Sequence, residues 1–181
     1  ANIYLVVDTS GSMAEQDKLK QAQSALKTFL DQIQGDRDRV GMVSFSTRVY
    51  GTIAPQDIGK QREYLKSQVN VLSADGRTAL LDAVSYAYDD LQRRGERDRI
   101  NAIVVMTDGI ENASSITLNQ LTQKVKQGNQ RGVPVVIFCI GYGSDADWNV
   151  LNALAEATGG QARSADPETI RRLYKILSTY F

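Results

Sequence analysis

Side chains that offer only oxygen atoms as ligands gather in three short segments of the chain. Asp8, Ser10 and Ser12 stand two residues apart in Asp-Thr-Ser-Gly-Ser-Met, directly after an apolar run. Asp108 follows a second apolar run in Thr-Asp-Gly, and Thr78 lies in Asp-Gly-Arg-Thr-Ala-Leu. Two carboxylates and three hydroxyls form a hard donor set that suits Mg²⁺ or Mn²⁺, and Ca²⁺ less definitely. The pattern predicts a divalent metal site at these five residues.

This donor set leaves room for an outside ligand. Octahedral coordination uses about six ligands, and Asp8 and Asp108 are the only members that carry a charge. An ion held partly through water therefore favours an external carboxylate at an open position. The alternative is that Asp8, Ser10 and Ser12 merely cap a turn, as such residues do in many loops. The second acidic loop after another apolar run favours the metal site.

The composition excludes several function classes. The chain has no His, which excludes Ser-His-Asp and Cys-His catalysis and removes the commonest zinc ligand. Its net charge is zero, so no basic field attracts nucleic acid. The single Cys139 lies in an apolar run and is expected to be a small buried hydrophobe. No apolar stretch approaches the roughly 20 residues of a membrane span.

The length of 181 residues is that of one domain. No repeat, linker or low-complexity tract divides it, so residues 1–181 are expected to form a single domain. The sequence begins at Ala1 and reaches an apolar run within two residues, which we interpret as a domain taken from a longer protein. Its localisation is not determined by the sequence.

Apolar runs alternate with helical periodicity, which is typical of βα units around a mostly parallel sheet. Strands are predicted at residues 3–7, 40–45, 48–53, 103–106, 135–140 and 161–163, of which 48–53 is expected to be an antiparallel edge. Helices are predicted at residues 19–33, 60–69, 80–91, 118–125, 151–155 and 170–181, with Gly128 closing the fourth and Asp147 capping the fifth. The expected fold class is a doubly wound α/β sheet with helices on both faces.

In such a sheet, ligands gather beyond the carboxyl ends of the strands. The segments that begin at Asp8 and Asp108 each follow a predicted central strand, so both carboxylates are expected at one edge of the sheet. The loop with Thr78 precedes a helix and can reach the same edge. Parallel packing thus explains how distant segments form one site.

These motifs resemble those of von Willebrand factor type A domains with a metal-ion-dependent adhesion site. The matching segments are Val-Val-Asp8-Thr-Ser-Gly-Ser-Met, Gly76-Arg-Thr-Ala-Leu-Leu-Asp82-Ala and Val-Met-Thr-Asp108-Gly, and the likeness runs over nearly the whole chain. The tail of the sequence, from Gly141 on, looks most like bacterial members, including those attached to solute-binding or chloride-channel-like surface proteins. Arg77 departs from the pattern, because bacterial members often have Gly there.

The resemblance implies a Rossmann-like sheet of about six strands with one antiparallel edge. It also implies that Ser10, Ser12 and Thr78 are direct metal ligands and that Asp8 and Asp108 bind directly or through water. The long cation of Arg77 either screens the site or selects acidic ligands. Asp82 is either a partner of the ligands or an ordinary helix residue.

We therefore predict a non-enzymatic module that binds a divalent cation and a Glu or Asp side chain of a protein partner. Neither nucleic acid nor direct membrane insertion is expected, and an extracellular or cell-surface location is favoured over the cytoplasm. The alternative is an intracellular assembly module of the same fold with a structural ion.

Two enzyme-like readings fit less well. A Mg²⁺-dependent aspartyl-phosphate phosphatase would need a second Asp where Ser10 stands. The segment Gly-Tyr-Gly-Ser-Asp-Ala from Gly141 fits a dinucleotide fingerprint, but Asp145 and Asp147 would meet the pyrophosphate.

Overall fold

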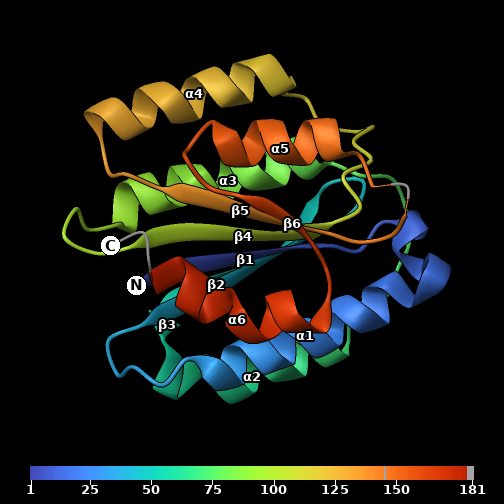
Figure 1. Ribbon diagram of the computed structural model, residues 1–181, viewed down its shortest axis with the longest axis horizontal. Coiled ribbons are helices and arrows are strands. Elements are labelled where there is room, and N and C mark those ends of the chain that lie inside the picture. The colour runs from blue at the N-terminus through green and yellow to red at the C-terminus, as the bar shows by residue number, and fades with distance from the viewer. Residues whose placement is uncertain (145, 179–181) are drawn as a thin grey trace.

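The predicted alternation of apolar runs and helices folds into one sheet between two layers of helices (Figure 1). The computed structural model describes residues 1–144 and 146–178. Its strands, within these residues, are β1 (Asn2–Asp8), β2 (Arg39–Phe45), β3 (Val49–Asp57), β4 (Asn101–Thr107), β5 (Val136–Gly141) and β6 (Ala162–Ser164). Its helices are α1 (Lys18–Gln32), α2 (Ile58–Asn70), α3 (Leu80–Arg94), α4 (Leu118–Arg131), α5 (Trp148–Glu156) and α6 (Pro167–Ser178).

The strand order confirms the predicted fold class. In the part of the chain that the structure describes, the six strands run in the order β3-β2-β1-β4-β5-β6. Every neighbouring pair is parallel except β2 and β3, so β3 is the antiparallel edge. The order reverses on either side of β1, which puts β1 and β4 side by side at the point where such sheets bind ligands.

Each face of the sheet has its own hydrophobic core. Ile3, Leu5 and Val7 of β1 pack toward α1, α2 and α6, whereas Tyr4 and Val6 pack toward α3, α4 and α5. Figure 1 shows these helix groups on opposite sides of the sheet. All seven residues of β1 are buried, as expected of a central parallel strand that is covered on both faces.

The edge strand β3 is longer than the six residues predicted. It spans Val49–Asp57, and its pairing with β2 shifts register between Val40 and Met42. Pro55 lies in this irregular stretch, where a missing backbone N–H breaks no regular ladder hydrogen bond. An edge strand accommodates such interruptions because only one of its sides is paired.

The end predicted for α4 is wrong. Gly128 does not close this helix, which continues to Arg131 and ends before Gly132. A Cβ atom on Gly128 would lie only 2.1 Å from the hydroxyl oxygen of Tyr88 on α3. The missing side chain therefore makes room for a neighbouring helix, a reason that lies outside the local sequence.

Other predictions are confirmed or lie beyond the described residues. Cys139 is fully buried in β5, as predicted. No helix in residues 1–144 and 146–178 is long and apolar enough to cross a membrane. Asp145 of the dinucleotide-like segment and Phe181 of the last helical stripe lie outside the described residues.

Candidate metal centre

The two predicted acidic ligands come together at the ends of neighbouring strands. Asp8 is the last residue of β1, and Asp108 directly follows the last residue of β4. The two strands pair in parallel, with Val7 opposite Met106. Both aspartates are fully buried, and the carboxyl ends of β1 and β4 lie where the loops gather, on the right of Figure 1. The parallel register thus brings together side chains that are 100 positions apart in the sequence.

The hydroxyls of the loop after β1 connect the two carboxylates. The backbone N–H of Ser10 donates to Asp8 Oδ1 at 2.8 Å. The hydroxyl oxygens of Ser10 and Ser12 lie 3.2 Å apart, and the Ser12 hydroxyl donates to Asp108 Oδ2 at 2.5 Å. Four of the five predicted ligands therefore form one continuous hydrogen-bonded cluster.

Thr78 reaches the same edge through its loop. The backbone N–H of Gly11 donates to the carbonyl of Gly76 at 2.9 Å, which joins this loop to the loop after β1. The Thr78 N–H donates to Asn112 Oδ1 at 2.8 Å, and the Thr78 carbonyl accepts from the N–H of Asn112 at 3.0 Å. Thr78 is buried between these contacts. The three segments predicted from the sequence are thus bonded to one another.

The environment of Asp8 disfavours a negative charge on its carboxylate. Burial is the largest influence and raises the pKa of Asp8 to about 6, against the hydrogen bonds from Ser10 and Thr107, which lower it. The negative charge of Asp108 raises it further. The hydrogen bonds of Asp8 thus do not offset its burial, and a bound cation would favour the charged form.

Two residues of this cluster were not predicted. The Thr107 hydroxyl donates to Asp8 Oδ2 at 2.6 Å and accepts from the N–H of Gly109 at 2.9 Å, which fixes the orientation of Asp8. Lys18 lies with its Nζ 3.5 Å from Asp108 Oδ2.

The sequence held one signal for Lys18. This lysine precedes Ala22, Ala25 and Phe29 by four, seven and eleven residues, so it lies on the buried stripe of α1. A cation at that position needs a buried partner, and the acidic loops are close in the fold.

The structure decides the role of Asp82, which the sequence left open. Both of its carboxylate oxygens accept hydrogen bonds from the N–H of Ser115, and Oδ1 also accepts from Ile116. Asp82 therefore holds the loop that follows β4. Because the same loop carries Asp108, the hydrogen bonds to Asp82 also help to fix the part of the chain that holds Asp108.

Arg77 lies exposed at the rim of the cluster. Its guanidinium donates to the carbonyl of Asn112, and its backbone N–H donates to Thr47 Oγ1 at 3.0 Å. The side chain is therefore tethered across two loops beside Thr78.

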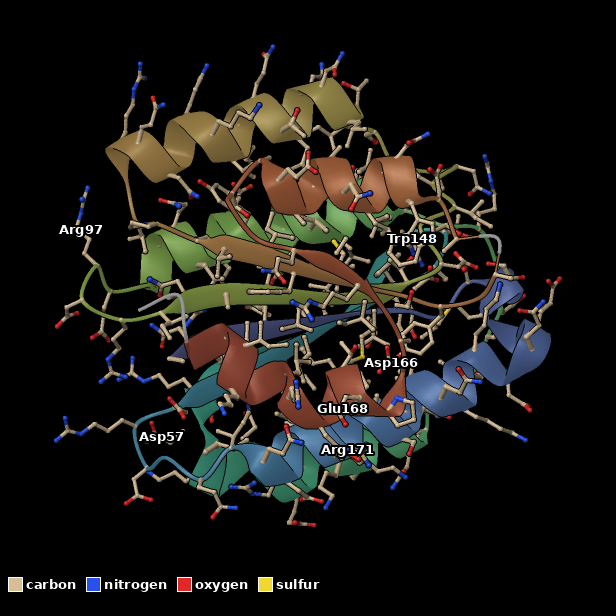
Figure 2. All side chains as sticks on the ribbon, in the orientation of Figure 1. Asp57, Arg97, Trp148, Asp166, Glu168 and Arg171 are labelled. Atoms are coloured by element: carbon tan, nitrogen blue, oxygen red, sulfur yellow. The ribbon has the colours of Figure 1, made fainter. Side chains whose placement is uncertain are left out.

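The start of α5 closes this end of the sheet on its other side. Asp147 caps the helix as predicted, because its Oδ1 accepts from the N–H of Val150 at 3.3 Å. Its own N–H donates to the carbonyl of Asp108 at 3.0 Å. Trp148, labelled in Figure 2, packs over Gly141, where a Cβ atom would lie 2.7 Å from the ring.

The donor set fits a hard divalent cation. No group of three or more His, Cys, Asp or Glu side chains that could hold a metal ion occurs among the residues described. A metal at this edge would therefore need hydroxyl oxygens as ligands beside the two carboxylates. Mg²⁺ and Mn²⁺ accept such oxygen ligands, whereas zinc sites are commonly built on His or Cys. Of the five predicted ligands, Asp8, Ser10, Ser12 and Asp108 are linked by hydrogen bonds, and the loop that carries Thr78 is bonded to the same segments.

A groove of about 710 Å³ opens beside the cluster, between β3 and α2. It begins at Thr9, the residue between two predicted ligands, and Asp75 lies on the same rim. Tyr50 and Tyr64 are half exposed along its walls, and the Tyr50 hydroxyl lies 2.8 Å from Thr9 Oγ1. The cluster of Asp8, Ser10, Ser12 and Asp108 is thus continuous with a larger polar surface.

Proteins of known sequence that resemble this chain are much longer than it is. Inter-alpha-trypsin inhibitor heavy chain H4 of Sus scrofa is 30% identical over 169 residues, which cover 90% of this chain and 18% of that protein. Calcium-activated chloride channel regulator 1 of Equus caballus is 31% identical over 160 residues, or 87% of this chain and 16% of that one. The chain thus spans less than a fifth of either relative.

Solved structures show the same fold. An aerotolerance-related membrane protein from Bacteroides fragilis superposes with a TM-score of 0.77 over 99% of both chains, at 16% identity. Proximal thread matrix protein 1 from the mussel byssus, described with a zinc-occupied MIDAS motif, gives 0.71 at 17% identity over 98% of this chain and 44% of that one. The manganese-loaded TRAP protein of Plasmodium vivax gives 0.69 at 18% identity over 98% and 72% of the chains.

The family model of the von Willebrand factor type A domain matches residues 2–175, which is nearly the whole chain. Domains of this kind generally mediate protein–protein interaction and adhesion and are typically not enzymes. Together with the sheet order and the loops described above, this match places the chain in a family: it belongs to the von Willebrand factor type A domains.

Proposed function

We propose that this domain binds a divalent cation at Asp8, Ser10, Ser12, Thr78 and Asp108, and through that ion an acidic side chain of a protein partner. One observation carries the proposal. Two fully buried carboxylates share a single hydroxyl-lined cluster at the switch point of the sheet. Buried charges are normally paired or bind metals, and two carboxylates so placed attract a cation.

The chemistry of the donors supports Mg²⁺ or Mn²⁺ as the ion, with Ca²⁺ as a further candidate. Carboxylate, hydroxyl and water oxygens suit these cations, and Mg²⁺ keeps several waters when few protein ligands are available. The similar structures described with zinc and with manganese support a divalent cation in this fold. A bound ion would act as a Lewis acid that holds an incoming carboxylate.

The rim of the site supports a protein partner with an acidic side chain. Arg77 is exposed and tethered beside Thr78, and Ile110 is 37% exposed two residues after Asp108. A cation and an apolar side chain around a central ion match a carboxylate flanked by apolar groups. The partner is thus expected to place Glu or Asp at the centre and apolar side chains around it.

The setting of the domain also belongs to the proposal. We infer that the domain is one part of a longer protein outside the cell or on its surface. Support comes from the length of the relatives and from similar structures that include a membrane protein and the pilus adhesin SpaC of Lactobacillus rhamnosus GG.

Metal binding is tested by titrating the purified domain with Mn²⁺ and Mg²⁺ in a calorimeter. The wild type is expected to bind one ion, and Asp108→Ala is expected to weaken binding by at least about 100-fold, because it removes one of the two charged ligands. The matched control is Asp36→Ala, an exposed aspartate of the loop before β2. Unchanged affinity in Asp108→Ala, with a native circular dichroism spectrum, would contradict the assignment.

Partner binding is tested once a partner has been captured from a native extract with the immobilised domain. EDTA and Asp8→Ala should each release it, and replacing one partner Glu or Asp by its amide should weaken binding by several kcal/mol. A scan in which every partner carboxylate can be neutralised with little effect would favour the alternative, an assembly module whose ion only braces the loops.

A further inference from the structure

A lysine lies inside the proposed metal centre. Lys18 is only 1% exposed, and its Nζ lies 3.5 Å from Asp108 Oδ2. The same carboxylate oxygen accepts the hydrogen bond of the Ser12 hydroxyl. Lysine is rarely buried unless it is paired, so this contact is a built part of the site. One of the metal ligands predicted from the sequence, Asp108, thus lies against the ammonium of a buried lysine.

The backbone before Lys18 is bent so that this side chain points inward. Gln16 and Asp17 adopt left-handed conformations with φ of 53° and 56°, although neither is glycine. Such conformations are unfavourable for residues with a Cβ atom and persist only where the surrounding structure enforces them. They turn the chain from the 3-10 segment Gly11–Asp17 into α1, with Lys18 as the first residue of the helix. The strained turn and the buried lysine are therefore one local feature.

We propose that Lys18 positions Asp108 for the metal and sets the affinity of the site for it. This inference rests on the proposed function. The ammonium holds the Asp108 carboxylate in place while no ion is bound. Its charge then opposes the ion, so that metal binds more weakly than two carboxylates alone would allow.

The charges of the three groups show why an acidic partner completes the site. Asp8 and Asp108 contribute two negative charges and Lys18 one positive charge, which leaves a single negative charge. A divalent cation changes this sum to one positive charge, and a partner carboxylate brings it to zero. With Lys18 present, metal and acidic partner therefore favour each other's binding, whereas without it the metal alone neutralises the two aspartates.

The test compares Lys18→Met with the wild type by Mn²⁺ titration and by thermal unfolding in EDTA and in saturating Mn²⁺. The variant is expected to bind Mn²⁺ at least tenfold more tightly, because an opposing charge is gone. It is expected to unfold at a lower temperature in EDTA, where Asp108 loses its paired cation, and to recover most of this loss in Mn²⁺. The matched control is Lys20→Met, an exposed lysine of the same helix, which should change neither quantity.

Two further variants separate charge from packing. Lys18→Arg keeps the positive charge and should keep an affinity near that of the wild type. Lys18→Gln removes the charge but keeps a polar side chain, and it replaces Lys18→Met if the latter does not fold in EDTA. A purely structural lysine would instead lower the unfolding temperature equally with and without Mn²⁺ and leave the affinity unchanged, which would overturn the inference.

The outcomes also separate this inference from the proposed function. Binding to the wild type, with no gain in Lys18→Met and Lys18→Gln, overturns the role of Lys18 and leaves the metal site intact. Binding only to the two neutral variants supports the role of Lys18 and contradicts the proposed function, because the lysine then takes the place of the ion. Binding to none of the proteins overturns both.

Discussion

Two buried acidic centres lie toward opposite ends of the sheet, and they are compensated in different ways. Asp90 on α3 accepts hydrogen bonds from the Tyr4 hydroxyl at 2.5 Å, from Arg93 at 3.0 Å and from Arg94 at 2.9 Å. One carboxylate there meets two guanidinium groups and a phenol. At the other end, Asp8 and Asp108 meet hydroxyls, backbone N–H groups and the ammonium of Lys18.

The pKa values report this difference. Burial works against the charged form of Asp90, but the hydrogen bonds of its three partners outweigh burial and hold its pKa below the ordinary value. Burial instead raises the pKa of Asp8 to about 6. The protein thus supplies the charge that Asp90 needs and leaves the other centre short of positive charge. Complete compensation indicates a structural role, whereas a deficit indicates a site for a ligand.

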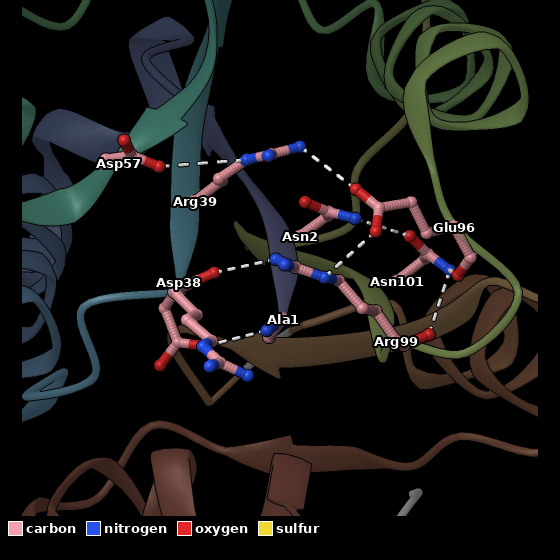
Figure 3. Close-up of polar contacts among 9 residues, drawn as sticks. Ala1, Asn2, Asp38, Arg39, Asp57, Glu96, Arg99 and Asn101 are labelled. Carbon is pink, nitrogen blue, oxygen red and sulfur yellow. Dashed lines mark hydrogen bonds and ion pairs between the residues drawn. The ribbon is translucent and has the colours of Figure 1, made fainter.

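A further polar network joins the connection between α3 and β4 to the sheet. Figure 3 shows the network near the start of β1, where Arg39 pairs with Glu96 at 3.1 Å and Arg99 pairs with the same carboxylate at 3.0 Å. Asn2 and Asn101 join the starts of β1 and β4 by a hydrogen bond of 3.0 Å. These contacts hold the connection between α3 and β4 against the starts of β1 and β2.

The largest expected effect is on stability at Asp90. Asp90→Ala should lower the free energy of unfolding by about 4 kcal/mol, because it leaves the Tyr4 hydroxyl buried without its charged acceptor and also removes the ion pairs with Arg93 and Arg94, which are themselves more than half exposed. The affinity for Mn²⁺ should remain that of the wild type. Urea unfolding and calorimetry measure the two quantities, and a change in metal affinity would remove the distinction between the centres.

The pH dependence of the metal-free protein should show opposite signs at the two centres. The folded pKa of Asp8 is raised from near 4 to about 6, so this group should make the protein more stable as the pH falls from 7 to 4, by up to about 3 kcal/mol. Asp90, whose pKa is lowered, contributes to the free energy of unfolding above pH 4, and this contribution is lost as the pH falls below 4. Urea unfolding in EDTA at several pH values measures this. Asp8→Asn should remove the gain between pH 7 and 4, and persistence of the gain would assign it to another group.

Mn²⁺ should stabilise the protein through the centre formed by Asp8 and Asp108, and this stabilisation should not depend on Asp90. At a Mn²⁺ concentration of about 100 times the dissociation constant, the wild type should gain about 2.7 kcal/mol, since the ion binds only the folded state. Asp90→Ala should gain the same amount, whereas Asp108→Ala, with an affinity at least about 100-fold lower, should gain at most about 0.4 kcal/mol. Thermal unfolding with and without Mn²⁺ measures the gain; an equal gain in Asp108→Ala would show that the ion binds elsewhere.

The smallest expected effect concerns the hydrogen bond that the Tyr4 hydroxyl donates to Asp90. Tyr4→Phe removes only the phenol hydroxyl and leaves the two arginines on the carboxylate, so it should cost about 1.5 kcal/mol. The pKa of Tyr4 is raised by burial and by Asp90, so its hydroxyl stays a neutral donor. Urea unfolding checks the value, and a loss as large as that of Asp90→Ala would mean that the arginines contribute little.

The local pattern of apolar residues in the sequence predicted most strands and helices of this protein correctly. The apolar runs predicted the central strands because both faces of the sheet are covered, and the 3.6-residue stripes predicted the helices because each helix buries one face. The end of α4 was wrong because it depends on Tyr88 of another helix. Lys18 and Thr107 were missed because their partners Asp108 and Asp8 are 90 and 99 positions away in sequence.

By itself, the sequence determined which side chains offer hard oxygen ligands and that each acidic motif follows a buried strand. Those facts depend on residue type and local spacing alone. Only the tertiary structure decided that β1 and β4 are neighbours, that Asp82 and Asn112 hold the intervening loops, and that Lys18 enters the pocket. The physical reason is that charge compensation depends on distances in space. Strand order and helix packing determine these distances, and residue spacing along the chain does not.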